Sequence, residues 1–139
     1  MICTTLTVVV IFMIVVGLVS PIWGQKKFSM PLWPERAVEQ NGIRAIEVIE
    51  NHHLINITQG GITVQFPKVD EANGAAILIC PGGGYRFEAI YDEGFEFANW
   101  LNEHGIAGSV LKYCLPNGHA SIPLTDAKQA IHIIRTHAV

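Results

Sequence analysis

The sequence predicts an α/β fold in which a mostly parallel sheet is covered by helices on both faces. Two short and continuously apolar segments, 75–80 and 106–113, are typical of strands buried on both sides. Each is followed by a segment with helical periodicity, 93–104 and 125 onward. Because strands that alternate with helices form right-handed βαβ crossovers, this order of elements predicts a three-layer α/β/α domain.

The chain length and charge fit one small domain. The 139 residues lie within the size of a typical domain, about 100–150 residues. Only nine lysines and arginines occur, they are scattered along the chain, and the formal net charge is −3. A nucleic-acid partner is therefore not expected, because such binding needs a concentrated basic surface.

The first 24 residues differ from the rest of the chain. Residues 1–24 carry no charged side chain, and 6–19 are almost purely aliphatic. This pattern predicts a secretory signal peptide that is cleaved after Gly24, leaving 25–139 as the domain. The alternative is an uncleaved membrane anchor formed by 2–23, because about 20 apolar residues span a bilayer. Both interpretations place the domain outside the cytoplasm, secreted or periplasmic.

The middle of the chain predicts short strands and one helix. Residues 26–41 are aperiodic and contain prolines, so we expect an ordered lead-in without a helix. Segments 48–58 and 61–66 are predicted to be strands, and apolar and polar residues alternate in the second. The helix predicted over 93–104 ends at Gly105, a residue that favours helix termination.

A second helix is predicted close to the end of the sequence. Thr125 or Asp126 is expected to cap its N-terminus. Its expected apolar face consists of Ala127, Ala130, Ile131 and Ile134. The alternation of elements calls for another central strand after this helix. Because the sequence ends at Val139, we expect a sheet that is truncated.

The loop after the first apolar strand carries the chemistry that the sequence suggests. Residues 80–85 read Cys-Pro-Gly-Gly-Gly-Tyr, and three consecutive glycines bring backbone N–H groups close to a ligand. Such donors at the carboxyl end of a strand are suited to stabilising an oxyanion. The other interpretation is a tight turn without function. A dinucleotide motif is excluded because Phe87 stands where the third glycine is needed, and no Gly-Lys-Ser/Thr triplet occurs.

Several short motifs in a fixed order resemble one family. From residues 32 to 137 the chain is similar to secreted carbohydrate esterases of the α/β-hydrolase superfamily, of the acetyl-xylan-esterase or feruloyl-esterase kind. The motifs that carry the resemblance are Leu32-Trp33-Pro34-Glu35, Cys80-Pro81-Gly82-Gly83-Gly84-Tyr85, Asp92-Glu93-Gly94, Ala98-Asn99-Trp100-Leu101-Asn102, Gly105-Ile106-Ala107, Val110-Leu111-Lys112-Tyr113-Cys114-Leu115-Pro116 and Pro123-Leu124-Thr125-Asp126-Ala127.

The resemblance implies the N-terminal half of an α/β-hydrolase sheet, truncated before the strand that carries the nucleophile. It implies that the backbone N–H groups of Gly83 and Gly84 form part of an oxyanion hole. Tyr85 would line the substrate pocket, or simply pack on the loop. Pro81 stands where lipase-like relatives have a histidine. Cys114 replaces a common arginine, which puts a local ion pair in doubt.

No catalytic residue is predicted within the chain. In α/β-hydrolases the serine lies in a Gly-x-Ser-x-Gly turn, followed by the acid and the histidine. Neither Ser109 nor Ser121 has that context. His119 is expected to be a surface or packing residue. The six histidines form no metal-binding spacing, so neither a metal nor a cofactor is expected.

The three cysteines, Cys3, Cys80 and Cys114, have two possible states. Cys3 leaves with the signal peptide if cleavage occurs. In an oxidising compartment Cys80 and Cys114 could form a bridge. We favour two buried thiols at strand ends.

Two hypotheses for function follow. The first is that the chain is the N-terminal part of an esterase that hydrolyses acetyl or feruloyl esters on plant polysaccharide, such as xylan, with an acylated polysaccharide or a small ester as substrate. The second is a short, secreted, non-catalytic protein that binds carbohydrate or a partner. If the sheet is truncated, its uncovered edge and apolar face predict that the isolated chain is poorly soluble or associates with itself.

Overall fold

The computed structural model describes residues 26–35 and 39–137. The predicted signal peptide or anchor lies outside these residues. Within the described ranges, no helix has the length and apolar character that crossing a membrane requires.

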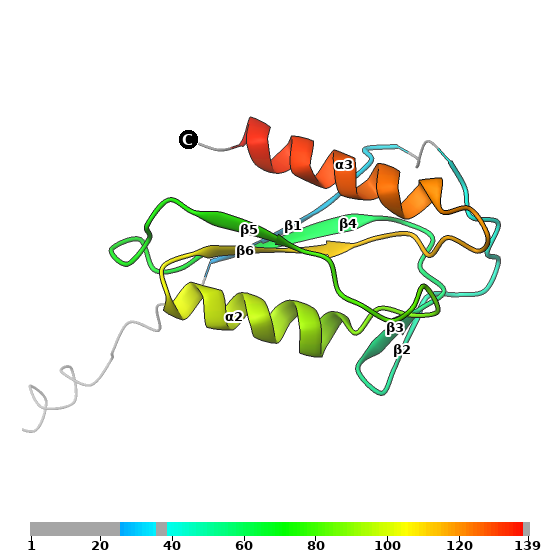
Figure 1. Ribbon diagram of the computed structural model, residues 1–139, viewed down its shortest axis with the longest axis horizontal. Helices are drawn as coiled ribbons and strands as arrows, with labels where there is room; N and C mark the ends of the chain where they lie inside the picture. The colour runs from blue at the N-terminus through cyan, green and yellow to red at the C-terminus, as the bar shows by residue number, and fades with distance from the viewer. Residues whose placement is uncertain (1–25, 36–38, 138–139) are drawn as a thin grey trace, which may run out of the picture.

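A four-stranded mixed sheet forms the centre of the molecule (Figure 1). Its order is β1 (Lys27–Pro31), β4 (Gly61–Gln65), β6 (Ala107–Lys112) and β5 (Ala76–Ile79). The ladders β1–β4 and β4–β6 are antiparallel, and only β5–β6 is parallel. The strands predicted around 61–66, 75–80 and 106–113 are thus confirmed.

The prediction of a mostly parallel sheet is wrong for the described residues. A parallel neighbour requires a long crossover, usually a helix. Only the connection from β5 to β6 contains one. The lead-in contributes β1, a strand that the sequence pattern did not indicate, and it pairs antiparallel with β4.

The predicted strand over 48–58 is instead a hairpin in a sheet of its own. It consists of β2 (Val48–Glu50) and β3 (His53–Ile55). The two residues between them, Asn51 and His52, both have positive φ, 49° and 65°. This is the backbone of a two-residue type I′ turn, in which asparagine is favoured. The expectation of one strand failed because the turn contains no glycine or proline.

Helices cover the two faces of the sheet, as predicted (Figure 1). A six-residue π-helix, η1 (Ile90–Phe95), leads directly into α2 (Glu96–Glu103). The helix α2 packs closely against β6 because Gly108 has no side chain. A Cβ atom at Gly108 would overlap Ala98 of α2. On the opposite face lies α3 (Ser121–Thr136).

The N-cap of α3 is Ala120 and not Thr125 or Asp126, so the predicted start is about one and a half turns too late. The helix begins at Ser121 and tolerates Pro123 because the first turn needs no N–H donor there. Asp126 lies inside the helix and is buried. It accepts hydrogen bonds from Trp33 Nε1 and Cys114 N, both at 2.8 Å. Its carboxyl group therefore joins the lead-in, the end of β6 and α3.

The expected apolar face of α3 is confirmed at Ala130, which is buried, and at Ala127 and Ile134, which are partly buried and pack against the core, but it is wrong at Ile131. The buried residues are Ile122, Pro123, Asp126 and Ala130, whereas the side chain of Ile131 is 42% exposed. The helical periodicity was predicted correctly, but the buried face was chosen from apolar residues alone. The polar Asp126 occupies the centre of the face because the buried donor Cys114 N and the partly buried donor Trp33 Nε1 need an acceptor.

The sheet has two edge strands, β1 and β5, and β5 differs from its prediction. We expected this strand to be buried on both faces, but residues 75–77 are exposed and only its second half is covered. Its described neighbour is β6 on one side, and none of the strands in the described ranges pairs with the other side.

Replacing Asp126 with alanine should lower the free energy of unfolding by about 2–5 kcal/mol, because one buried donor and one partly buried donor each lose an acceptor. Urea unfolding followed by circular dichroism measures the change. Ser121→Ala is the matched control on α3, since it removes only an exposed hydrogen bond to Glu39 and should cost about 0.5 kcal/mol or less. Equal losses in the two variants would contradict this role.

Candidate active site at the glycine loop

The glycine loop, residues 80–85, follows β5 and borders a cavity of about 420 Å³. The walls come from three places: the loop itself, the end of β6 and the first turns of α3. Its lining residues are Cys80, Pro81, Gly82, Gly83, Gly84, Tyr85, Leu111, Tyr113, Pro123, Leu124 and Ala127. The cavity thus lies beyond the carboxyl ends of the two parallel strands, where ligands of α/β sheets usually bind.

Backbone conformation explains why the loop contains glycine. Gly83 has φ of 144° and Gly84 has φ of 59°. A Cβ atom on Gly83 would overlap the carbonyl oxygen of Phe87, whereas one on Gly84 would have no neighbour within 4 Å. The turn is held by hydrogen bonds from Arg86 N to Gly83 O and from Ala89 N to Gly82 O, at 3.1 and 2.9 Å.

The three glycine N–H groups are not equivalent. Gly82 N donates to Glu93 Oε2 at 2.6 Å. For Gly83 N and Gly84 N, no acceptor is found among the residues that the structure describes. The two N–H groups that the sequence singled out thus remain available to a ligand. Their role as oxyanion donors stays a prediction.

Glu93 has a role that the sequence did not indicate. We expected Asp92 and Glu93 to lie in the first turn of a helix, with a favourable effect on its dipole. They do lie in the first turn of η1. In addition, the carboxyl group of Glu93 reaches back across 11 residues to hold Gly82. A fold-dependent contact of this kind leaves no local pattern in the sequence.

Two tyrosines form the wall of the cavity. Tyr113 OH donates to Pro81 O at 2.9 Å and so fixes the start of the loop. Tyr85 projects from the loop with 56% of its side chain exposed, and its ring meets that of Tyr113 edge-on at 6.2 Å. Burial, followed by the charge of Glu88, raises the pKa of Tyr113. Tyr85 therefore lines the cavity, with Tyr113 behind it. The role of Tyr85 in binding a substrate stays a prediction.

A fully buried carboxyl group, Glu88, supports the loop from behind. Its Oε1 accepts a hydrogen bond from Tyr113 N at 2.6 Å, and its backbone pairs with Leu54 of β3. Its Oε2 has no partner among the described residues. Burial raises the pKa of Glu88 to about 9, so this side chain is neutral at pH 7.

Among the described residues, no serine lines the cavity. Ser109 is buried inside β6, and Ser121 donates to Glu39 on the surface. His119 is exposed and is not part of the cavity wall. In the described ranges, no cluster of three or more His, Cys, Asp or Glu residues could hold a metal ion.

The two described cysteines are both free. Cys114 is buried, as we expected, but Cys80 is exposed at the β5 edge of the sheet, which corrects the expectation of two buried thiols. Although Cys80 is exposed, partial desolvation of its thiol, followed by the charge of Glu88, raises the pKa of this thiol. Burial, with the nearby Asp126, raises the pKa of Cys114 to about 12. Neither thiol is activated as a nucleophile. Cys3 lies outside the described residues.

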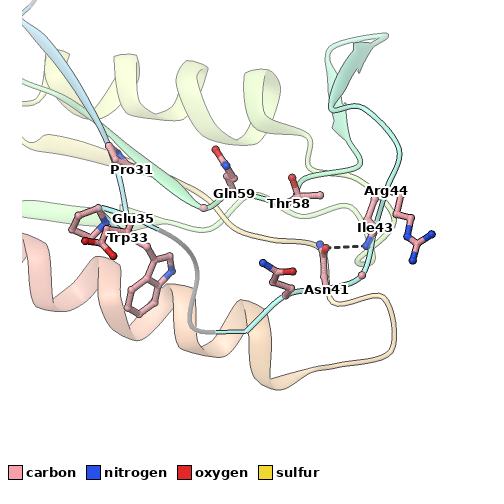
Figure 2. Close-up of a pocket in the computed structure, with 12 residues that line it drawn as sticks. Pro31, Trp33, Glu35, Asn41, Ile43, Arg44, Thr58 and Gln59 are labelled. Atoms are coloured by element: carbon pink, nitrogen blue, oxygen red, sulfur yellow. Dashed lines mark hydrogen bonds between the residues drawn. The ribbon is translucent and has the colours of Figure 1, made fainter.

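A second cavity, of about 630 Å³, lies between the lead-in and the loop after β3 (Figure 2). Asn41 is the buried polar residue of this cavity, and its side chain already forms hydrogen bonds within the protein. Its Nδ2 donates to Ile57 O and Leu115 O, and its Oδ1 accepts from Ile43 N. Because these hydrogen bonds hold the fold together, we favour the cavity at the glycine loop as the functional one.

Comparison with known proteins relates the chain to carbohydrate esterases. It is 41% identical over 69 residues to an acetylxylan esterase of Xylanibacter ruminicola, a match that covers 50% of this chain and 14% of that protein. Among solved structures it resembles an acetyl ester-xyloside bifunctional hydrolase from Caldicellulosiruptor lactoaceticus, with 27% identity and a TM-score of 0.58. That match covers 86% of this chain and 39% of the hydrolase. No family model matches the chain.

These likenesses support the resemblance drawn from the sequence motifs at the level of carbohydrate esterases. The chain spans 14% and 39% of the lengths of the two relatives. The complete activity of either relative is therefore not transferred to these 139 residues by similarity alone.

Proposed function

We propose that the chain is the N-terminal part of a secreted α/β-hydrolase that removes acetyl or feruloyl-type groups from plant polysaccharide such as xylan. In this proposal the 139 residues supply one half of the oxyanion hole. The two relatives, whose names refer to acetylated xylan or xylosides, support this class of substrate. Both are much longer than this chain, which supports the view that other residues supply the remaining catalytic groups.

The observation that carries the proposal is the pair of free N–H groups at Gly83 and Gly84, bordering a cavity. During ester hydrolysis the carbonyl oxygen becomes negatively charged in the tetrahedral intermediate. Fixed backbone donors stabilise that charge without having to reorganise. The apolar walls formed by Leu111 and Leu124 suit the methyl or ring portion of an acyl group.

The other steps belong to residues beyond this chain. In the proposed enzyme a serine hydroxyl attacks the ester carbonyl and a histidine accepts its proton, while an acidic residue orients the histidine. The same histidine then protonates the sugar oxygen as its bond to the acyl carbon breaks, which releases the sugar hydroxyl. Water hydrolyses the acyl-enzyme by the reverse proton transfers. The contribution of Gly83 and Gly84 is needed in both halves of the reaction.

Secretion is part of the proposal, supported by the apolar and uncharged residues 1–24. Polysaccharide of the plant cell wall is outside the cell, so an exported enzyme suits this substrate. The alternative, an uncleaved anchor formed by 2–23, would keep the domain on the outer side of a membrane. N-terminal sequencing of the exported protein distinguishes the two.

The proposal predicts that the 139-residue chain has no serine-dependent esterase activity. With p-nitrophenyl acetate as substrate, we expect the rate of hydrolysis to equal the background rate measured with the heat-denatured chain in the same buffer. The reading frame continued beyond Val139 is expected to encode a Gly-x-Ser-x-Gly sequence, and its product to release acetate from acetylated xylan. Turnover by the short chain that a serine-directed reagent blocks would overturn the assignment of roles. A continuation without such a sequence would remove support for an esterase.

The alternative function is carbohydrate binding without catalysis. It is favoured by the lack of a cavity-lining serine among the described residues together with an open cavity beside Tyr85. Titration of the chain with acetylated xylo-oligosaccharide, followed by the amide resonances of Gly83 and Gly84, tests this directly. Saturable shifts that a Tyr85→Ala variant loses would favour the binding protein.

A further inference from the structure

The peptide units of the glycine loop determine where its N–H groups point. In a planar trans peptide, each N–H points opposite to the carbonyl of the preceding residue. The carbonyl of Gly82 accepts a hydrogen bond from Ala89 N at 2.9 Å, and the carbonyl of Gly83 accepts one from Arg86 N at 3.1 Å. Both carbonyls therefore point toward the segment that follows the loop, and the N–H groups of Gly83 and Gly84 point away from it.

The first peptide unit of the loop, between Pro81 and Gly82, is held at both ends. Tyr113 OH donates to the carbonyl of Pro81 at 2.9 Å. The N–H of Gly82 donates to Oε2 of Glu93 at 2.6 Å. A Cβ atom on Gly82 would lie 2.8 Å from the same oxygen, so a glycine here leaves room for the carboxylate. Rotation of this unit would carry the following units with it, so both contacts affect the direction of the later N–H groups.

Glu93 closes a cycle of three hydrogen bonds with the loop. Its backbone N–H donates to the carbonyl of Ala89 at 3.0 Å, and the N–H of Ala89 donates to the carbonyl of Gly82. The side chain of Glu93 in turn accepts from the N–H of Gly82. Both backbone polar groups of Gly82 are thus bound to the start of η1, one by Glu93 directly and the other through Ala89.

The helix η1 that carries Glu93 is packed tightly against the sheet and the loop. Gly94 is buried, and a Cβ atom there would lie 2.8 Å from a methyl group of Val110 in β6 and 3.2 Å from the ring of Pro81. Wide π-helical turns of this kind are frequent at functional sites. The side chain of Glu93 is exposed, so solvent and salt screen its charge from a ligand. The carboxylate therefore reaches the loop from a firmly packed base.

We propose that Glu93 is a positioning residue, whose carboxylate holds the N–H of Gly82 and thereby sets the direction of the Gly83 and Gly84 N–H groups. Donors that already point at the developing charge stabilise it without reorganising. Glu93 contacts neither of these two N–H groups and acts on them through Gly82. The value of this contact for ester hydrolysis rests on the proposed function, but its effect on the shape of the loop does not.

Nuclear magnetic resonance of the full, isotope-labelled chain tests this inference without any ester. In Glu93→Ala the amide of Gly82 should exchange its hydrogen about tenfold to a hundredfold faster, because it loses a hydrogen bond to a charged group. The residual dipolar couplings of the Gly83 and Gly84 amides should change, because their direction is no longer fixed. The amide of Glu88, which donates to Leu54 O at 2.9 Å, is the internal reference and should keep its wild-type exchange rate.

Two further variants separate the contact from the charge and from the helix. Glu93→Gln keeps an acceptor oxygen, so it should restore most of the slow exchange at Gly82 and the wild-type couplings of the next two amides. Asp92→Ala is the matched control, because it removes the neighbouring carboxylate from the same turn of η1. Asp92 lies 3.6 Å from Nδ1 of His52 and not at the loop, so its removal should leave all three glycine amides unchanged.

Unchanged couplings of Gly83 and Gly84 in Glu93→Ala would overturn the inference. Equal acceleration of exchange at Gly82 and Glu88 would do so too, since it would indicate a general loss of stability. If Glu93→Ala does not fold, Glu93→Gln decides: the amide proton of Gly82 should move upfield as it loses a charged acceptor, and an unmoved proton contradicts the contact. These readouts involve no ester, so a failure of the esterase proposal leaves them as they are.

Discussion

Replacing Gly83 with alanine is expected to prevent cooperative folding, or to lower the free energy of unfolding by more than about 4 kcal/mol. The added Cβ would overlap the carbonyl oxygen of Phe87. That oxygen belongs to the backbone, so a change of rotamer cannot relieve the overlap. The left-handed φ of 144° adds strain for any residue with a side chain. The result is measured as the midpoint and amplitude of urea unfolding.

Gly84→Ala is the matched control within the same loop. Gly84 also has a positive φ, 59°, but a Cβ atom there meets nothing within 4 Å. Its cost should be only the conformational one, about 1–2 kcal/mol. The prediction therefore rests on the difference between adjacent glycines. Similar destabilisation in both variants would show that the contact with Phe87 does not shape the loop.

A second large effect is expected from Glu88→Gln, as a change in the pH dependence of stability. In the folded chain the pKa of Glu88 is about 9, against an ordinary value of 4.5. Between these two pH values the unfolded chain has lost the proton while the folded chain keeps it. Each unit of pH in this window therefore lowers the free energy of unfolding by about 1.4 kcal/mol. Below pH 4.5 the residue makes no such contribution, because both states are protonated.

The glutamine variant is expected to remove this slope and to be the more stable protein at pH 8. Its amide oxygen can still accept the hydrogen bond from Tyr113 N. Urea unfolding at several pH values between 4 and 9 measures the two curves, which should meet at the acidic end. Glu103→Gln, an exposed change at the end of α2, should leave the wild-type slope intact. Parallel curves for the wild type and Glu88→Gln would contradict the buried, neutral state of Glu88.

Much of the local architecture could be predicted because it depends on neighbouring residues. The alternation in 61–66, the apolar runs at 75–80 and 106–113 and the helical spacing of 93–104 all correspond to observed elements. The glycine loop was found in the sequence because three consecutive glycines, each costly in backbone freedom, stand between an apolar strand and a helix. The motifs also suggested a carbohydrate esterase, which the two relatives support.

Strand direction and the support of the site were decided only by tertiary structure. Residues 27–31 become a strand because β4 offers an antiparallel partner, and the edge position of β5 follows from the order of the whole sheet. Periodicity tells which side of a strand is apolar, but it does not tell which strand lies beside it.

The same holds for the acidic residues. The sequence suggested a helix-dipole role for Glu93 and a capping role for Asp126, and it did not single out Glu88. Each instead accepts a backbone hydrogen bond from a residue at least 11 positions away. The sequence by itself determined where the glycine loop lies and which N–H groups it offers. The tertiary structure decided what holds that loop in place, because hydrogen bonds between distant segments form only when the sheet and helices are packed.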